Sequence, residues 1–157
     1  MTSKFKQVTN DAAIVVTAGA YTAKDVVGGL ITCTLPEPLS SAGVWLTSIG
    51  IDVEGSVLPA FNVHVLNQTP ASALADNAPF VLSAADHLLK KAHFELTAGD
   101  YKATQDDARA KGYKSGLNIA LQCPEGIILL YLECTGAPTL ASTGALAQVE
   151  LGLLYQE

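Results

Sequence analysis

Alternating residues between Val44 and Leu66 constrain the fold more than any other part of the chain. Odd positions in the first half of this stretch carry Trp45, Thr47, Ile49, Ile51 and Val53. After a break at residues 55–59 the alternation resumes in Phe61, Val63 and Val65. A period of two residues is typical of strands with one buried face. The pattern therefore predicts two strands, with Trp45 on the same buried face as Ile49.

The rest of the chain has a similar pattern, in which short apolar runs are separated by Gly, Pro, Ala, Ser and Thr. Further strands are predicted at residues 13–17, 30–35, 117–122, 127–134 and 146–155. Together they indicate an all-β chain, a jelly-roll-like antiparallel β-sandwich of about eight strands with one short helix. An immunoglobulin-like sandwich is the next choice, although its Cys-Trp-Cys spacing does not match this sequence.

Four local patterns give sharper expectations. The apolar run at residues 127–132 predicts a central strand that is covered on both sides. Ser83 and Asp86 have the spacing of a helix N-cap and its third residue. The pair at residues 28–29, Gly-Gly, indicates a turn or a close backbone approach. The polar residues 98–116 fit either a solvated loop or a strand pair with a turn.

The length of 157 residues corresponds to about one domain. Residues 1–12 are polar and are expected to form an N-terminal arm or a loosely held edge. Residues 13–157 are expected to form a single β-sandwich domain.

Composition limits the partners. Charged residues make up only 15% of the chain and hydrophobic residues 49%, which suggests a surface that other subunits partly cover. A monomer whose polar surface uses Thr, Ser, Asn and Gln is the alternative. The net charge of -6 argues against nucleic acid and against an anionic membrane surface.

Neither a signal peptide nor an apolar run long enough to span a bilayer is recognised. The three cysteines, Cys33, Cys123 and Cys134, lack zinc-site spacing and sit within or beside apolar runs. They are expected to be buried and reduced, which favours synthesis in the cytoplasm.

The residues needed for catalysis are not gathered in any segment. His64, His87 and His93 lack the spacing of a metal site, so no metal and no cofactor are expected. The adjacent acids Asp106 and Asp107 diverge in an extended chain and suit a solvated loop better than a glycosidase pair. Tyr101 and Tyr113 occupy loop-like positions, where they suit either a sugar-binding surface or, more simply, a core edge or protein interface.

Three short strings resemble a widespread group of tailed-bacteriophage virion proteins. They are YTAKDVVGGL at residues 21–30, ADNAPF at residues 75–80 and GAPT at residues 136–139. The resemblance covers roughly residues 21–154. This group comprises small jelly-roll proteins that decorate, or cement, the outside of the capsid.

The resemblance implies a structural protein without enzymatic activity, located on the virion after synthesis in the host cytoplasm. Its implied partners are the major capsid protein and further copies of itself, as a homodimer or homotrimer. Phe5 would anchor the N-terminal arm on a neighbouring subunit, with Tyr101 and Tyr113 as further interface candidates. Two other hypotheses remain open: a carbohydrate- or receptor-binding module of a tail or neck, and a cupin-like metal enzyme.

Overall fold

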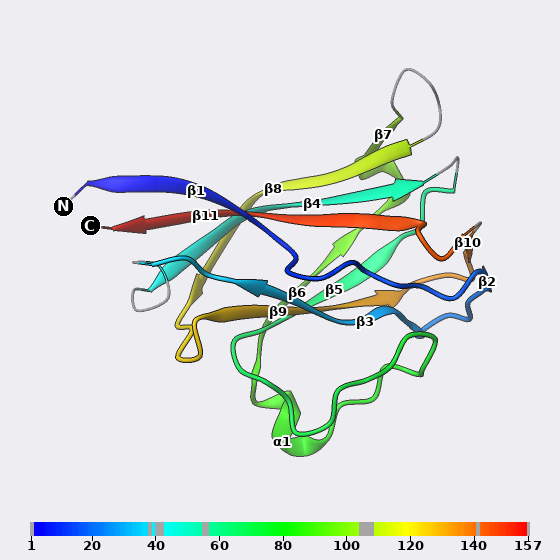
Figure 1. The fold of residues 1–157 in the computed structure, drawn as a ribbon, viewed down its shortest axis with the longest axis horizontal. Coiled ribbons are helices and arrows are strands. Elements are labelled where there is room, and N and C mark those ends of the chain that lie inside the picture. The colour runs from blue at the N-terminus through cyan, green and yellow to red at the C-terminus, as the bar shows by residue number, and fades with distance from the viewer. Residues whose placement is uncertain are drawn as a thin grey trace.

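The computed structural model describes residues 2–37, 39, 43–54, 57–103, 109–140 and 142–156. Nearly all of its regular structure is β-strand (Figure 1). The elements in chain order are β1 (Ser3–Thr9), β2 (Gly19–Ala20), β3 (Val26–Thr34), β4 (Val44–Glu54), β5 (Phe61–Leu66), α1 (Ala84–His87), β6 (Lys90–Leu96), a 3₁₀ turn (Ala98–Asp100), β7 (Tyr101–Ala103), β8 (Arg109–Leu121), β9 (Ile127–Cys134), β10 (Thr139–Leu140) and β11 (Leu146–Gln156).

Two antiparallel sheets enclose the main core. One has the order β1-β11-β4-β8-β7 and the other the order β3-β9-β5-β6, while β10 and β2 form a small separate pair. The long strands pair in a nested way, β1 with β11, β3 with β9, β4 with β8 and β5 with β6. A long hairpin wrapped into two layers produces this order, which is that of a jelly roll. The predicted fold class is confirmed.

The strand β9 lies in the middle of its sheet and is buried on both faces. Ile128, Leu130 and Leu132 point into the main core between the sheets. Leu129 and Tyr131 point the other way, into a second apolar cluster. The prediction of a central strand covered on both sides is therefore confirmed.

The second cluster is covered by residues 67–89, the excursion between β5 and β6. Phe80 and Leu82 of this excursion pack onto the cluster. The excursion also holds α1, where the backbone N–H of Asp86 donates to Ser83 Oγ at 3.1 Å. The predicted short helix and its N-cap are confirmed.

The predicted placement of Trp45 on the buried face is wrong. Leu153 of β11 pairs with Leu46 and its neighbour Gly152 pairs with Ser48, so β4 carries one extra residue at this point, a β-bulge. One extra residue exchanges the two faces of the strand. Leu46 is therefore buried together with Ile49, whereas Trp45 is 42% exposed on the opposite face.

The first residues form an edge strand of the five-stranded sheet. Residues 3–9 form β1, which pairs along its length with β11, and Val8 contributes to the core. The division into an arm and a domain at residue 12 stays a prediction. For residues 98–116 the structure shows the strand-pair alternative, because β7 pairs with β8.

Candidate functional site

One broad surface of the protein is the outer sheet face, defined here as the side of β1, β11, β4, β8 and β7 that points away from the core. Cross-strand pairing places Phe5 opposite Leu154, Leu154 opposite Trp45 and Trp45 opposite Ala120. Phe5 is 63% exposed and Trp45 is 42% exposed. Large aromatic side chains at this exposure are typical of contact surfaces.

Tyr113 lies on the same face. It is 51% exposed and pairs with Gly50 of β4. Tyr101 differs, because it points inward from β7 and is only 8% exposed. A Cβ added to Gly112 would lie 2.8 Å from the Tyr101 ring, so the glycine makes room for this ring. Burial, followed by the charge of Asp100, raises the pKa of Tyr101.

Of the three predicted interface residues, the structure thus brings Phe5 and Tyr113 onto one face and places Tyr101 at the edge of the core. Their roles in binding stay predictions. The sequence pattern did not predict that Trp45 is exposed, because Trp45 falls on the same alternate positions as the buried Ile49 and Ile51. The signal that could have identified it is its rarity, since it is the single tryptophan of the chain.

Two grooves flank Trp45. One, of about 490 Å³, runs past Ala120 and Gln122. The other, of about 290 Å³, runs past Asn118 and Leu154. Trp45 is therefore open to contact on both sides, with side-chain amides beside it.

The three strings that carry the family resemblance meet in one place. Val26 N donates to Ala78 O at 2.8 Å, which joins the first string to the second. Tyr21 N donates to Pro138 O at 2.9 Å, which joins the first string to the third. The strings are thus parts of one structural joint.

Asp76 lies at the centre of this joint. Its carboxylate accepts hydrogen bonds from Thr17 N (2.6 Å), Thr17 Oγ1 (2.7 Å), Gly28 N (2.7 Å) and the Tyr21 hydroxyl (2.9 Å). Burial, and next the Asp76 carboxylate, raise the pKa of Tyr21, so its hydroxyl stays a donor. A carboxylate bound by so many donors ties the three segments of this joint together.

His64 of β5 is buried under Phe80, with ring centroids 4.0 Å apart. Its Nε2 lies 2.6 Å from Glu133 Oε2, and its Nδ1 has no hydrogen-bond partner among the described residues. Burial lowers the pKa of His64, and Glu133 opposes this effect. His64 thus lies between the ring of Phe80, which packs on the second cluster, and the carboxylate of Glu133.

The predicted burial of the three cysteines is confirmed, and all are free. Burial raises the pKa of Cys33 and Cys134 to about 12 and that of Cys123 to about 11. In the described ranges, no group of three or more His, Cys, Asp or Glu side chains could hold a metal ion. Asp106 and Asp107 lie outside the described residues. Among the helices that the structure describes, none has the length and apolar character to cross a bilayer.

No protein family model matches the chain, and no curated protein matches it. The chain is similar to a solved structure of tomato aspermy virus, with 10% identity and a TM-score of 0.42 over 99% of this chain and 78% of that one. It is similar to a chain of the cyanophage Pam1 capsid, with 14% identity and a TM-score of 0.32 over 98% of this chain and 84% of that one.

The chain also spans 28% of a GH87 alpha-1,3-glucanase catalytic domain, with 10% identity and a TM-score of 0.33 over 98% of this chain. The similar structures thus include viral capsid proteins as well as a glycoside hydrolase. Every TM-score is below 0.5 and every identity below 25%. The fold class therefore rests on the sheet topology alone.

Proposed function

We propose that this chain is a non-enzymatic structural protein of a tailed-phage virion, a decoration protein that binds the outside of the major capsid shell. One observation carries the proposal: Phe5, Trp45 and Tyr113 are exposed on the same sheet face. Exposed aromatics on a rigid surface supply large contact area at low cost in side-chain entropy. The outer sheet face is the proposed capsid-binding surface.

Two further features support the proposal. The resemblance of residues 21–30, 75–80 and 136–139 points to phage virion proteins. In addition, the most strongly bound carboxylates hold the fold: Asp76 binds four donor groups, and Asp86 binds Ser83 Oγ and the backbone N–H of Ala71. A rigid sandwich of this kind suits a protein that bridges neighbouring subunits.

Self-association belongs to the same proposal. Many copies on one shell multiply a modest contact area, and a dimer or trimer adds avidity. Analytical ultracentrifugation of the purified protein measures this directly. A sedimentation coefficient of a monomer at all concentrations would remove this part of the proposal.

The test of attachment is co-sedimentation with capsids that lack the protein. Binding is expected to saturate at a fixed ratio to the major capsid protein, and sedimentation without saturable binding would contradict the proposal.

A carbohydrate-binding module is the second candidate. It is favoured by the amide side chains of Asn118 and Gln122 beside Trp45, since an aromatic ring and amides suit the apolar face and the hydroxyls of a sugar. A glycan array separates the two functions: saturable binding to one sugar supports this candidate, and the decoration protein should show none.

A further inference from the structure

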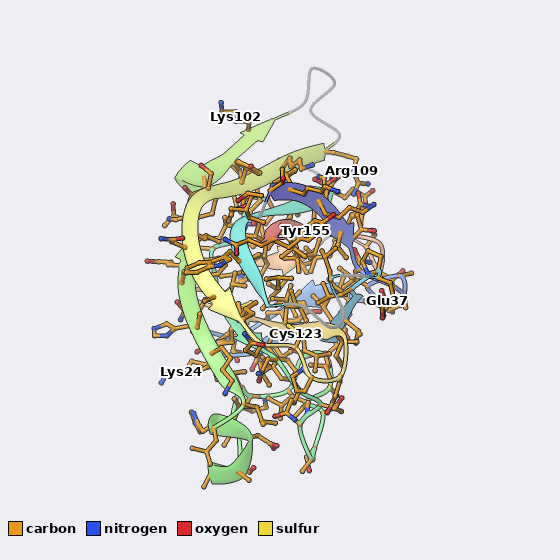
Figure 2. The ribbon with its side chains drawn as sticks, turned by 90° about the vertical axis from the view of Figure 1, so that its left-hand side faces the viewer. Lys24, Glu37, Lys102, Arg109, Cys123 and Tyr155 are labelled. Atoms are coloured by element: carbon orange, nitrogen blue, oxygen red, sulfur yellow. The ribbon has the colours of Figure 1, made fainter. Side chains whose placement is uncertain are left out.

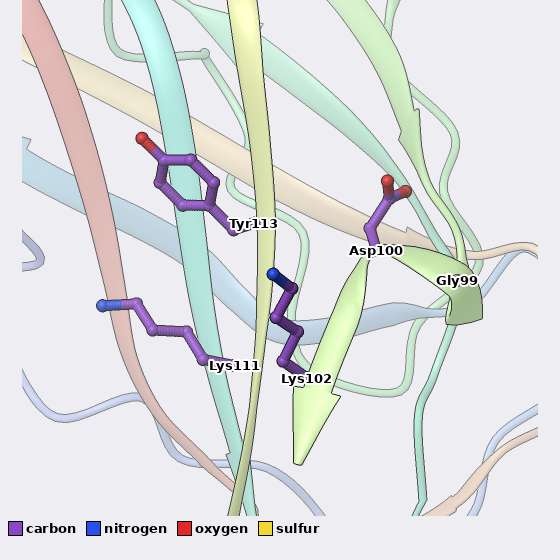
Figure 3. A pocket seen from close by; sticks show the side chains of 5 residues that line it. All are labelled: Gly99, Asp100, Lys102, Lys111 and Tyr113. Atoms are coloured by element: carbon purple, nitrogen blue, oxygen red, sulfur yellow. The ribbon is translucent and has the colours of Figure 1, made fainter. Parts of the chain in front are cut away.

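A cavity of about 470 Å³ opens on the outer sheet face, away from Trp45. It is lined by Gly99, Asp100, Lys102, Lys111 and Tyr113 (Figure 3). β7 supplies Lys102 and β8 supplies Lys111 and Tyr113. In Figure 3 the Lys102 side chain extends from β7 toward β8, whereas the Tyr113 ring extends from β8 over β4, with its hydroxyl pointing away from Lys102.

Two lysines of this cavity face each other across the strands. Lys102 and Lys111 are direct partners in the β7–β8 register. Like charges directly opposite each other destabilise an antiparallel pair. Lys111 is compensated, because its Nζ forms an ion pair with Glu150. Lys102 has no ion-pair partner among the described residues.

Among the described residues, the carboxylates of Asp100 and Glu150 lie close to this cavity and already have partners. Asp100 Oδ2 accepts from Thr97 N at 2.7 Å and from Thr97 Oγ1 at 2.9 Å, and it lies 3.6 Å from Lys114 Nζ. The bonds to Thr97, more than Lys114, hold the pKa of Asp100 below its usual range. Glu150 accepts from Gln7 at 2.8 Å in addition to its ion pair. Neither carboxylate therefore compensates Lys102.

Tyr113 adds an aromatic wall to the cavity. Its hydroxyl has no hydrogen-bond partner among the described residues, and its ring is half-exposed. Gly50 lies beside the ring on β4, where an added Cβ would be 3.0 Å from Lys111 Cε and 3.6 Å from Tyr113 Cδ2. The missing side chain at this position keeps space between the lysine and the tyrosine.

We infer that this cavity receives the carboxylate of an Asp or Glu side chain from the partner protein, bound by Lys102 Nζ. This inference rests on the proposed function, since the partner is the capsid surface. An ammonium group is a donor to a carboxylate, which only accepts. The methylene groups of Lys102 and Lys111 and the ring of Tyr113 provide apolar walls for the acidic side chain.

The overall charge selects the kind of anion. The chain carries a net charge of -6, so it repels extended polyanions such as nucleic acid or an anionic lipid surface. A single carboxylate on a protein surface is affected mainly by charges within about 10 Å, the screening length at 0.1 M salt. Of the two lysines that line the cavity, Lys102 is the one without an ion-pair partner among the described residues.

The first experiment measures capsid affinity by co-sedimentation for the full chain and for Lys102→Gln. Lys24→Gln is the matched control, because Lys24 is also exposed and lies far from Lys102 (Figure 2). The Lys102→Gln variant should bind about tenfold more weakly, as expected for loss of one charge-assisted contact. Its melting temperature should be unchanged or slightly higher, because the like-charge pair is removed. Equal affinities of Lys102→Gln and the unmodified chain would overturn the inference.

The second experiment needs no capsid. Hexaglutamate, hexaglutamine and inorganic phosphate are titrated into the isotopically labelled protein, and the amide resonances of β7 and β8 are followed by NMR. Hexaglutamate alone should shift these resonances, with Lys102→Gln abolishing the shift and Lys24→Gln preserving it. Stronger shifts with phosphate, or none with hexaglutamate, would overturn the inference. If the protein binds no capsid but passes this titration, the proposed function fails and the carboxylate site remains.

Discussion

The Tyr21 hydroxyl donates to the carboxylate of Asp76, with 2.9 Å to each carboxylate oxygen, across a separation of 55 residues. This contact ties the segment before β3 to the excursion that covers the second cluster. Gly28 N reaches the same carboxylate because the β3 register shifts between Val27 and Ile31, where the Gly-Gly pair lies.

Asp76→Asn should therefore destabilise the protein by about 2 to 3 kcal/mol, because an amide nitrogen would face donors that now meet a carboxylate oxygen. The melting temperature should fall by roughly 5 to 10 °C for a chain of this size. Thermal unfolding followed by circular dichroism checks this. Glu95→Gln is the control, since Glu95 is exposed and has no hydrogen-bond partner in the described part of the chain. Equal melting temperatures for the two variants would show that the joint does not carry stability.

Tyr21→Phe removes one donor and leaves the others in place. Its cost should be smaller, about 1 kcal/mol. In the double variant with Asp76→Asn the two losses should not add, since both remove the same contact. Additive losses in a double-mutant cycle would mean that the two groups act independently.

A third prediction concerns Gly152, which lies under Phe5. A Cβ at this position would collide with Ser48 Oγ and would lie 3.1 Å from the Phe5 ring. Gly152→Ala should cost about 1 to 3 kcal/mol through overpacking. In a Ser48→Ala background the same change should cost clearly less, because the hydroxyl is gone. Urea unfolding of the four proteins measures this, and an undiminished cost would exclude Ser48 as the obstacle.

The sequence predicts most of the fold because burial follows strand periodicity closely. The run at residues 127–132 is apolar on both parities, and β9 is covered on both faces. The face of Trp45 could not be predicted, since a bulge after Leu46 leaves no mark in the hydrophobic pattern. The Gly-Gly pair was predictable as a close approach: Gly28 has a φ of 79°, and a Cβ there would collide with Ile14.

The candidate site was predictable only in part. Phe5 and Tyr113 are exposed as an interface requires, but the inward direction of Tyr101 depends on its pairing with Gly112. The cavity depends on the register of β7 with β8, which sets Lys102 opposite Lys111. Register between strands that are not joined by a recognisable tight turn cannot be obtained from one sequence.

A fourth prediction follows from the buried His64. Its folded-state pKa lies below the ordinary value of 6.5, because burial outweighs the attraction of Glu133. Below pH 6.5 the unfolded chain binds a proton more readily than the folded chain, so acidification favours unfolding. The contribution to stability is complete above pH 6.5 and is lost as the pH falls toward the lower folded-state pKa.

Urea unfolding between pH 7 and pH 5 measures this effect. The groups facing His64 are Glu133 on β9, Lys90 and His93 on β6 and Phe80 of the excursion. His64→Gln should flatten the pH dependence in this interval, and His87→Gln, at an exposed position on α1, is the control for the loss of an imidazole. If the free energy of unfolding of His64→Gln changed with pH as steeply as that of the unmodified chain, other groups would be responsible for the pH dependence.

A fifth prediction tests the outer sheet face at Trp45. Trp45→Ala should weaken capsid binding by at least about tenfold, because a central aromatic contact contributes 2 kcal/mol or more. Because the ring is half-exposed, its removal should lower the free energy of unfolding of the isolated protein by less than about 1 kcal/mol. Val81→Ala, in the excursion on the opposite sheet, is the control for exposed apolar residues. Equal binding of both variants would remove Trp45 from the proposed surface.

The most direct test of the central claim is the copy number of this protein in purified virions, measured by quantitative mass spectrometry against the major capsid protein. A decoration protein is expected in many copies, at a fixed ratio to the shell subunits. Absence from the particle, or only a handful of copies, would contradict a place on the capsid surface.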